Sequence, residues 1–149
     1  MSTQVQNSFE MLHPILTDCC KRIQTQVIHA YNIPMKLFET GRTKERHQNL
    51  INKGRAQSIL SRHLYNMEHN PPLYATAVVY VYYDGKWSWN LRDSTIQSWY
   101  QVFGNLVLDV CPELQWGMVN RKSSDYTYFQ LREDVIVDNF DTFPCIMHP

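Results

Sequence analysis

A tight-turn dipeptide between two strand-like segments constrains the fold more than any other feature. Asp84-Gly85 separates residues 75–83, a run of aromatic and β-branched residues, from residues 86–89, which include two tryptophans. An Asp-Gly pair between two such runs favours a two-residue hairpin turn, because glycine readily takes the positive φ that this turn requires. The sequence therefore predicts two antiparallel strands near the middle of the chain.

Two amphipathic helices are expected, one on each side of the hairpin. Apolar residues recur at helical spacing over residues 12–31, with charged and polar residues between them. The second helix begins at Asp93 or Ser94, either of which can cap it, and ends at Pro112. Its apolar face comprises Ile96, Trp99, Phe103, Leu106 and Val110.

Shorter elements complete the predicted fold. Thr43 is placed to cap a helix over residues 44–52, which Gly54 would stop, and Asn70-Pro71-Pro72 makes residues 55–72 a long loop. The remaining predicted strands are residues 35–39, 114–117 and 126–131. This order predicts an α+β fold, in which a small antiparallel sheet packs against two to three helices.

Length and composition indicate one globular domain over residues 1–149, with a flexible leader at 1–8 and an irregular tail at 132–149. Hydrophobic residues make up 44% of the chain and charged residues 19%, which excludes a disordered protein. The 14 basic residues balance the 14 acidic ones. Because the chain has no net positive charge to attract phosphate groups, nucleic acid and anionic membranes are disfavoured as partners.

The sequence carries no targeting or membrane signal that would take the protein out of the cytoplasm. The longest apolar stretch, residues 73–83, falls far short of the roughly 20 residues that span a bilayer. The N-terminus lacks the basic start and apolar run of a signal peptide. The cysteines form no C-x-x-C pair, and we expect buried thiols in a reducing compartment rather than disulfides or zinc ligands at Cys19, Cys20, Cys111 and Cys145.

The reactive residues form one loose group in the sequence. His63 is followed closely by Glu68 and His69, and Asp125 lies on a later loop. A single histidine on a loop is more often a hydrogen-bonding or surface residue than a metal ligand. Residue types alone therefore give only a weak indication of a metal site.

The order and spacing of several short motifs resemble a known family of enzymes. The matching segments between Leu12 and Leu131 are Leu12-His13-Pro14, Phe38-Glu39-Thr40-Gly41-Arg42-Thr43 with Glu45-Arg46, Leu50 and Gly54, Ser61-Arg62-His63-Leu64, Gly85-Lys86 with Trp89, Glu113-Leu114 with Trp116-Gly117, and Asp125 with Tyr128-Phe129-Gln130-Leu131. Together they resemble the phage L-alanyl-D-glutamate peptidase endolysins of the VanY-like D-alanyl-D-alanine carboxypeptidase superfamily, which cut peptidoglycan stem peptides with one zinc ion. The resemblance implies the zinc D-Ala-D-Ala peptidase-like fold.

The resemblance also implies where a zinc site would lie. The family holds zinc with the histidine of a Ser-x-His motif, the aspartate of an Ala-x-Asp motif and the histidine of an Asp-x-x-His motif, whose aspartate is the acid/base. Three such ligands leave an open position for a water that the metal makes acidic enough to attack an amide. His63 matches the first ligand and Asp125 matches the acid/base.

Two of the three ligand positions depart from the family pattern. The third falls on Tyr128, and the second falls on Val79 if Ala77-Val78-Val79 aligns with Ala-x-Asp, or on Asn70 in an ungapped alignment from His63. Valine has no ligand atom, asparagine is a poor zinc ligand, and tyrosine coordinates only as a phenolate. We therefore expect no bound cofactor, with His63 and Asp125 as vestigial site residues.

Three functions are compatible with this pattern. The first is a catalytically inactive pseudoenzyme of phage origin that binds a protein or a peptidoglycan fragment, with Arg42 and Ser61 lining the ligand site. The second is an active zinc peptidase that rebuilds its metal site with Glu68 or His69. The third is a structural or accessory component of a virion. The host bacterium's cytoplasm or the virion is the expected location.

The sequence is rich in aromatic residues near its predicted hairpin and last strand. Those residues are Tyr74, Tyr80, Tyr82, Tyr83, Trp87, Trp89, Tyr126 and Tyr128. They are candidates for a protein-binding surface. Because strands alternate between faces, about half of them should instead belong to the core.

Overall fold

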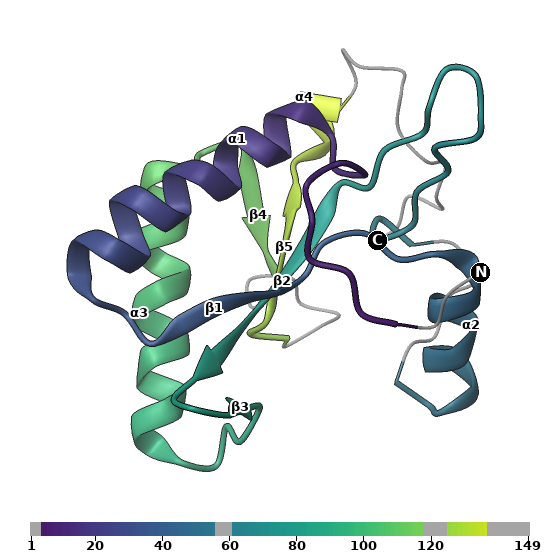
Figure 1. Ribbon diagram of the computed structural model, residues 1–149. Coiled ribbons are helices and arrows are strands. Elements are labelled where there is room, and N and C mark those ends of the chain that lie inside the picture. Colours follow the sequence, from purple (N-terminus) through teal and green to yellow (C-terminus); the bar gives the residue numbers. More distant parts are fainter. Residues whose placement is uncertain (1–3, 56–60, 118–124, 137–149) are drawn as a thin grey trace.

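The computed structural model describes residues 4–55, 61–117 and 125–136 and has an α+β architecture, as the sequence predicted (Figure 1). The strands β1, β2, β5 and β4 lie side by side in that order, β3 pairs with β2, and every pairing is antiparallel. The elements are α1 Pro14–Ile23, η1 Gln24–His29, β1 Met35–Glu39, α2 Lys44–Asn52, β2 Ala77–Tyr83, β3 Trp87–Ser88, α3 Ser94–Val110, β4 Leu114–Trp116, β5 Tyr128–Leu131 and α4 Glu133–Ile136.

The first helix has the predicted extent but changes type along its length. Pro14 occupies its first turn, and His13 caps it by accepting a hydrogen bond at Nδ1 from the backbone N–H of Ile15 at 3.1 Å. After Ile23 the chain continues as the wider π-helix η1. Asn32 then takes a positive φ of 52° and turns the chain into β1.

The predicted caps and turns follow from local chemistry. Thr43 accepts a hydrogen bond at Oγ1 from the backbone N–H of Arg46 at 3.0 Å, and Asp93 caps α3 in the same manner. Gly54 and Gly85 have φ values of +72° and +76°, which glycine tolerates. The helix stop and the hairpin turn therefore lie where the sequence placed them.

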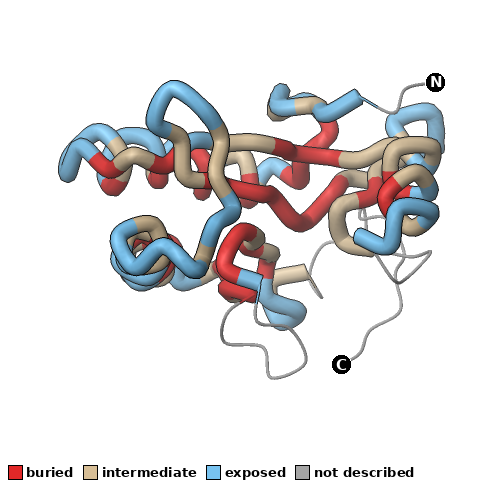
Figure 2. Tube along the Cα trace, turned by 90° about the horizontal axis from the view of Figure 1, so that it is seen from below, coloured by how far each residue is buried: buried red, intermediate tan, exposed pale blue. Residues whose placement is uncertain are grey.

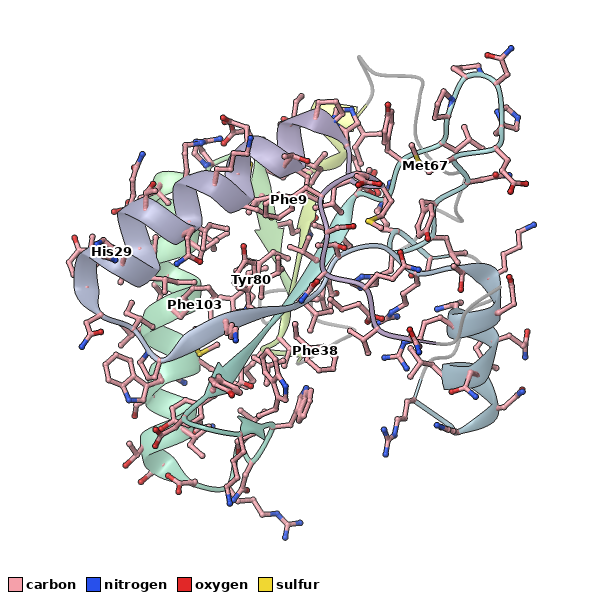
Figure 3. All side chains as sticks on the ribbon, viewed as in Figure 1. Phe9, His29, Phe38, Met67, Tyr80 and Phe103 are labelled. Carbon is pink, nitrogen blue, oxygen red and sulfur yellow. The ribbon has the colours of Figure 1, made fainter. Side chains whose placement is uncertain are left out.

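One face of the sheet forms the hydrophobic core with α1 and α3. Val78, Tyr80 and Tyr82 of β2 point to this face, and the Tyr80 ring lies 5.3 Å from that of Phe103 between centroids (Figure 3). The buried segments run through the middle of the molecule, while the outer sides of the helices are exposed (Figure 2). The alternation of side chains along a strand thus places Tyr80 and Tyr82, two of the three aromatic residues of β2, on the core face.

The other face of the sheet is directed away from this core. Val79 of β2 lies opposite Glu39 of β1 and Tyr128 of β5. The helix α2 reaches this face through Arg46, which binds the Glu39 carboxylate, and Figure 1 shows α2 set apart from α1 and α3. The candidate functional residues are therefore positioned on this second face.

The long loop before β2 and the leader are tied to the rest of the fold. Isolated bridges join Arg42 to Leu64 and Asn66 to Leu73. In the leader, the backbone carbonyl of Gln6 accepts a hydrogen bond from the Thr40 N–H at 2.7 Å. Within the tail that was expected to be irregular, α4 forms one short helix, because the Arg132 carbonyl accepts from the N–H groups of residues 135 and 136.

The cysteines that the structure describes agree with the sequence-based expectation. Cys19, Cys20 and Cys111 are buried and free, whereas Cys145 lies outside the described residues. Within the described ranges, no helix combines the length and apolar character needed to cross a membrane.

Gly104 on α3 provides a test of the core packing. A Cβ atom at this position would lie 2.5 Å from Cε2 of Trp116, whose ring is stacked on Phe129 and anchored by a hydrogen bond from Nε1 to the Tyr126 carbonyl. A glycine-to-alanine change in an open helix stabilises by roughly 0.5–1 kcal/mol. Gly104→Ala should instead lower the free energy of unfolding by about 1–3 kcal/mol, because overpacking dominates.

Urea unfolding followed by circular dichroism measures this difference. Asn105→Ala, on the exposed side of the same helix, is the control and should change stability by less than about 0.5 kcal/mol. A Gly104→Ala protein that is more stable than the wild type would contradict the packing described.

Candidate functional site

Hydrogen bonds of its backbone fix the position of His63 in the loop between α2 and β2. Its N–H donates to Ser61 Oγ at 3.2 Å, and its carbonyl accepts from the Arg42 N–H at 2.6 Å. These bonds tie together two of the segments on which the family resemblance rests. The Ser61 side chain thus stabilises the backbone turn that leads to His63. The bond to the His63 carbonyl brings Arg42 next to His63.

The imidazole of His63 lies in a desolvated, positively charged environment. Its Nδ1 is buried without a hydrogen-bond partner in the part of the chain that the structure describes. Burial holds the pKa of His63 well below its usual value of 6.5, and the charges of Arg42 and then His47 lower this pKa further. The ring is therefore neutral at pH 7.

Val79 and Tyr128, which the resemblance places at two ligand positions, are direct neighbours across the sheet. Val79 and Tyr128 pair in register, so their side chains share one face with Cβ atoms about 5 Å apart. The Tyr128 ring meets the His63 ring edge-on, with centroids 6.1 Å apart. His63 thus lies beside Tyr128.

The Tyr128 ring also fills space beside a glycine. A Cβ atom on Gly117 would lie 2.7 Å from Tyr128 Cζ and 2.6 Å from the Asp125 backbone oxygen. A phenol in the interior usually finds a hydrogen-bond partner, which predicts a bond from the Tyr128 hydroxyl to His63 or Asp125, and the structure shows an edge-on contact between the Tyr128 and His63 rings. A close packing of aromatic rings therefore occupies this position.

Asp125 is directed elsewhere in its own loop. Its Oδ1 accepts hydrogen bonds from the Thr127 N–H at 2.7 Å and from Thr127 Oγ1 at 2.5 Å, and the residue is exposed. The Asp125 carboxylate is thus bound within its own loop, three positions before Tyr128.

The residues considered for a rebuilt metal site lie on the exposed loop. Glu68, His69 and Asn70 are all exposed, and His69 Nδ1 pairs with the Pro71 carbonyl at 2.8 Å. Across residues 4–55, 61–117 and 125–136, no three His, Cys, Asp or Glu side chains are grouped to hold a metal ion. Of the two alignments for the second ligand position, only Val79 lies next to Tyr128.

A buried carboxylate between two arginines is the feature that sequence reasoning assigned no role. Glu39 is 1% exposed, and its Oε1 and Oε2 accept from Arg42 Nε and Arg46 Nε, each at 2.8 Å. From the sequence, two roles are open for Arg42, a ligand-binding residue or a turn residue bound to backbone carbonyls, and in the structure its side chain pairs with Glu39. The spacing of Glu39, Arg42 and Arg46 was the available signal.

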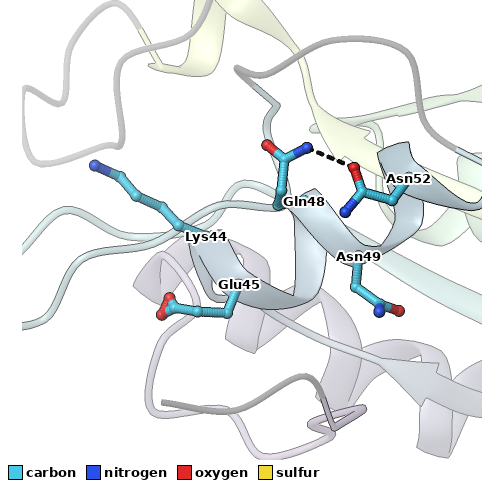
Figure 4. Close-up of a pocket in the computed structure, with 5 residues that line it drawn as sticks. All are labelled: Lys44, Glu45, Gln48, Asn49 and Asn52. Atoms are coloured by element: carbon cyan, nitrogen blue, oxygen red, sulfur yellow. Dashed lines mark hydrogen bonds between the residues drawn. The ribbon is translucent and has the colours of Figure 1, made fainter.

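Surface hollows accompany α2 but do not reach His63. One of about 460 Å³ lies along the outer side of the helix, where Gln48 Nε2 donates to Asn52 Oδ1 at 2.9 Å (Figure 4). Its other lining residues are Lys44, Glu45 and Asn49. A second hollow of about 400 Å³ lies between the start of α2 and residues 65–68. Among the described residues, neither hollow is lined by a cysteine, a serine or a histidine.

Comparison with known proteins gives a structural match without a sequence match. No protein-family model matches the chain, and no curated protein is similar at a significant level. The chain is similar in structure to the L-Ala D-Glu endopeptidase ChiX of Serratia marcescens, with a TM-score of 0.62 and 21% identity. This match covers 87% of this chain and 85% of that one, so the chain has a peptidase-like fold.

Removal of the buried carboxylate should reveal how far the site depends on it. Glu39→Ala leaves two partly buried guanidinium groups without their counter-charge, and it should lower the free energy of unfolding by about 3 kcal/mol. Glu68→Ala, at an exposed glutamate on the neighbouring loop, is the control, with an expected change under about 0.5 kcal/mol. Thermal and urea unfolding measure both, and equal stability of the two variants would rule out a structural role for Glu39.

Proposed function

We propose that the protein is a catalytically inactive relative of the peptidoglycan peptidases that binds a protein or a cell-wall fragment instead of cleaving it. The observation that carries the proposal is the register of β2 and β5, which makes Val79 and Tyr128 direct neighbours beside His63. Arg42, whose backbone N–H donates to the His63 carbonyl, is the third element of this site and would contact the ligand. We further propose a phage origin, with the host cytoplasm or the virion as its location.

The chemistry of these side chains does not fit the zinc ion of the active enzymes. Only His63 offers a good ligand atom, since valine has none and a phenol must first lose a proton with a normal pKa near 10. A stable zinc site needs several such ligands acting together. The site is therefore a binding surface in which an apolar and an aromatic side chain replace two ligands.

The alternative is an active zinc peptidase whose metal site is rebuilt with Glu68 or His69, and the described part of the chain shows no metal-ligand group around these two residues. Glu68 and His69 are exposed on the loop, and the His69 ring is engaged with the Pro71 carbonyl. The match to ChiX supports ligand chemistry of the cell-wall peptide type, because that protein is an L-Ala D-Glu endopeptidase. The accessory virion role differs from our proposal by predicting no affinity for peptidoglycan fragments.

Metal content and turnover test the proposal together. The purified protein should contain well under one zinc per chain by elemental analysis, and it should release no free amino groups from peptidoglycan even with added zinc. Without a metal-activated water the amide barrier stays close to its uncatalysed height. One tightly held zinc that is lost on His69→Ala, or turnover that a chelator abolishes and zinc restores, would overturn it.

Rebuilding the site is the sharper test. The double variant Val79→Asp with Tyr128→His places three ligand types at neighbouring positions, and zinc should raise its melting temperature by binding the folded state. The wild type, each single variant, and the double variant carrying His63→Ala should show no such rise. A folded double variant whose melting temperature is indifferent to zinc would contradict the assignment of Val79 as the second position.

A further inference from the structure

We propose that four aromatic side chains at the β3 end of the sheet form a binding platform for the amino-sugar rings of a glycan. They are Phe38, Tyr83, Trp87 and Trp89, and we call them the aromatic platform. The inference rests on the proposed function and deepens it, because it names the part of a cell-wall fragment that this end of the molecule recognises.

The platform is one continuous group of rings from three segments of the chain. The Phe38 ring meets those of Trp87 and Trp89 edge-on, at centroid distances of 5.0 Å and 5.1 Å. Phe38, labelled in Figure 3, thus joins β1 to β3. The Trp87 ring lies 4.8 Å from that of Tyr83, its partner in the pairing of β3 with β2. These contacts fix the positions of the rings before a ligand arrives.

The platform shares the face of the sheet on which the proposed ligand site lies. Side chains alternate along β2, so Tyr83 points to the same face as Val79, which is four residues earlier and about 13 Å away. Phe38 lies where the pairing of β1 with β2 shifts by one residue, next to Glu39, which pairs with Val79. The platform and the pair of Val79 with Tyr128 therefore lie along one face of β2.

The rings are accessible and keep their polar groups for a ligand. Trp89 is 50% exposed, and the other three rings are partly exposed. The indole N–H groups of Trp87 and Trp89 and the Tyr83 hydroxyl make no hydrogen bond to a residue that the structure describes. An aromatic ring packs on the apolar C–H face of a sugar, while an N–H or hydroxyl group beside it binds the oxygens at the sugar's edge. The platform offers both kinds of contact.

Charge at the platform disfavours a cationic or a polyanionic ligand. Lys36 Nζ lies 4.6 Å from the centroid of the Tyr83 ring and 5.9 Å from that of Trp87, so a cation of this chain already occupies the position that these rings offer. A second cation would be repelled there. A nucleic acid needs a basic groove beside its stacking rings, and this chain has no net charge. A neutral ligand, such as an N-acetylated sugar, fits these charges.

The exposed area of the platform is small for a protein partner. An aromatic side chain has about 150–250 Å² to bury, and one of the four rings is half exposed while the others are less so, which gives on the order of 300 Å². A stable protein interface takes about 800 Å² from each partner. The platform therefore suits a ligand of a few sugar rings better than it suits a protein surface.

A glycan on the platform agrees with the ligand of the proposed function. In peptidoglycan, each stem peptide is attached to an N-acetylated amino sugar of the glycan strand. With sugar rings on Trp87 and Trp89, the attached peptide would run along β2 toward Val79 and Tyr128. One cell-wall fragment would then contact both parts of this face.

Titration of the intact protein with chitotriose, a short oligomer of N-acetylglucosamine, tests the platform. Binding is followed by calorimetry and by NMR shifts of the indole N–H signals. We expect saturable binding that shifts the signals of Trp87 and Trp89 and leaves those of Trp99 and Trp116 in place. Maltotriose, which has no acetamido groups, should bind at least about tenfold more weakly. Trp89→Ala should weaken chitotriose binding by about tenfold or more, because the most exposed ring is lost.

Two further variants separate ring stacking from a general effect of exposed aromatic residues. Tyr31→Ala removes a side chain that is 61% exposed at the end of the first helix, outside the platform, and it should leave the affinity unchanged. Trp89→Phe keeps an aromatic face, and it should retain more of the affinity than Trp89→Ala does. Circular dichroism confirms that each variant is folded before titration.

The outcomes separate the platform from the proposed function. Absence of saturable chitotriose binding, equal affinity for maltotriose, or equal affinities of Trp89→Ala and Tyr31→Ala would each overturn the platform. If chitotriose binds as expected and the protein cleaves peptidoglycan with zinc, the platform stands and the proposed inactivity fails. If peptidoglycan fragments bind the wild type and Trp89→Ala equally without being cleaved, the proposed function stands and the platform fails.

Discussion

The register of β2 with its two neighbouring strands is the constraint on which the rest of the molecule depends. Because side chains alternate between faces, one register places Tyr80 in the core and Val79 on the opposite face. A slip of one residue would exchange the two sets and expose the core residues. The same pairing that buries Tyr80 against Phe103 therefore also places Glu39, Val79 and Tyr128 in a row.

The charge distribution on that second face differs from that of a metal site. A site built from a histidine, an aspartate and another histidine needs the charge of a cation to hold its ligands together. Val79 and a Tyr128 phenol need no such charge, and the neutral His63 packs against the tyrosine ring. On the same face, the Glu39 carboxylate is paired with Arg42 and Arg46, and these three side chains together carry one unit of positive charge.

The sequence predicted local structure better than it predicted the site. Thr43 and Asp93 cap their helices through hydrogen bonds with nearby backbone N–H groups, and Gly85 forms the hairpin turn through its positive φ. The structure has each of these features where the sequence predicted it. The pairing of Val79 with Tyr128 joins residues 49 positions apart, and no local pattern encodes it. Glu39 was part of a recognised segment, but its role depends on burial, which a charged residue in a short strand does not reveal.

Loss of a metal need not mean loss of ligand recognition at such a site. In a metallopeptidase the metal polarises the reacting group, whereas groups farther along the ligand are recognised by protein side chains. The arginines depend on Glu39 for their position and not on the histidine or the strand residues that a metal would need. In the proposed function, Val79 and Tyr128 stand at metal-ligand positions, whereas the pairing of Glu39 with its two arginines needs neither side chain, so metal binding and ligand recognition depend on separate groups on one face of the sheet.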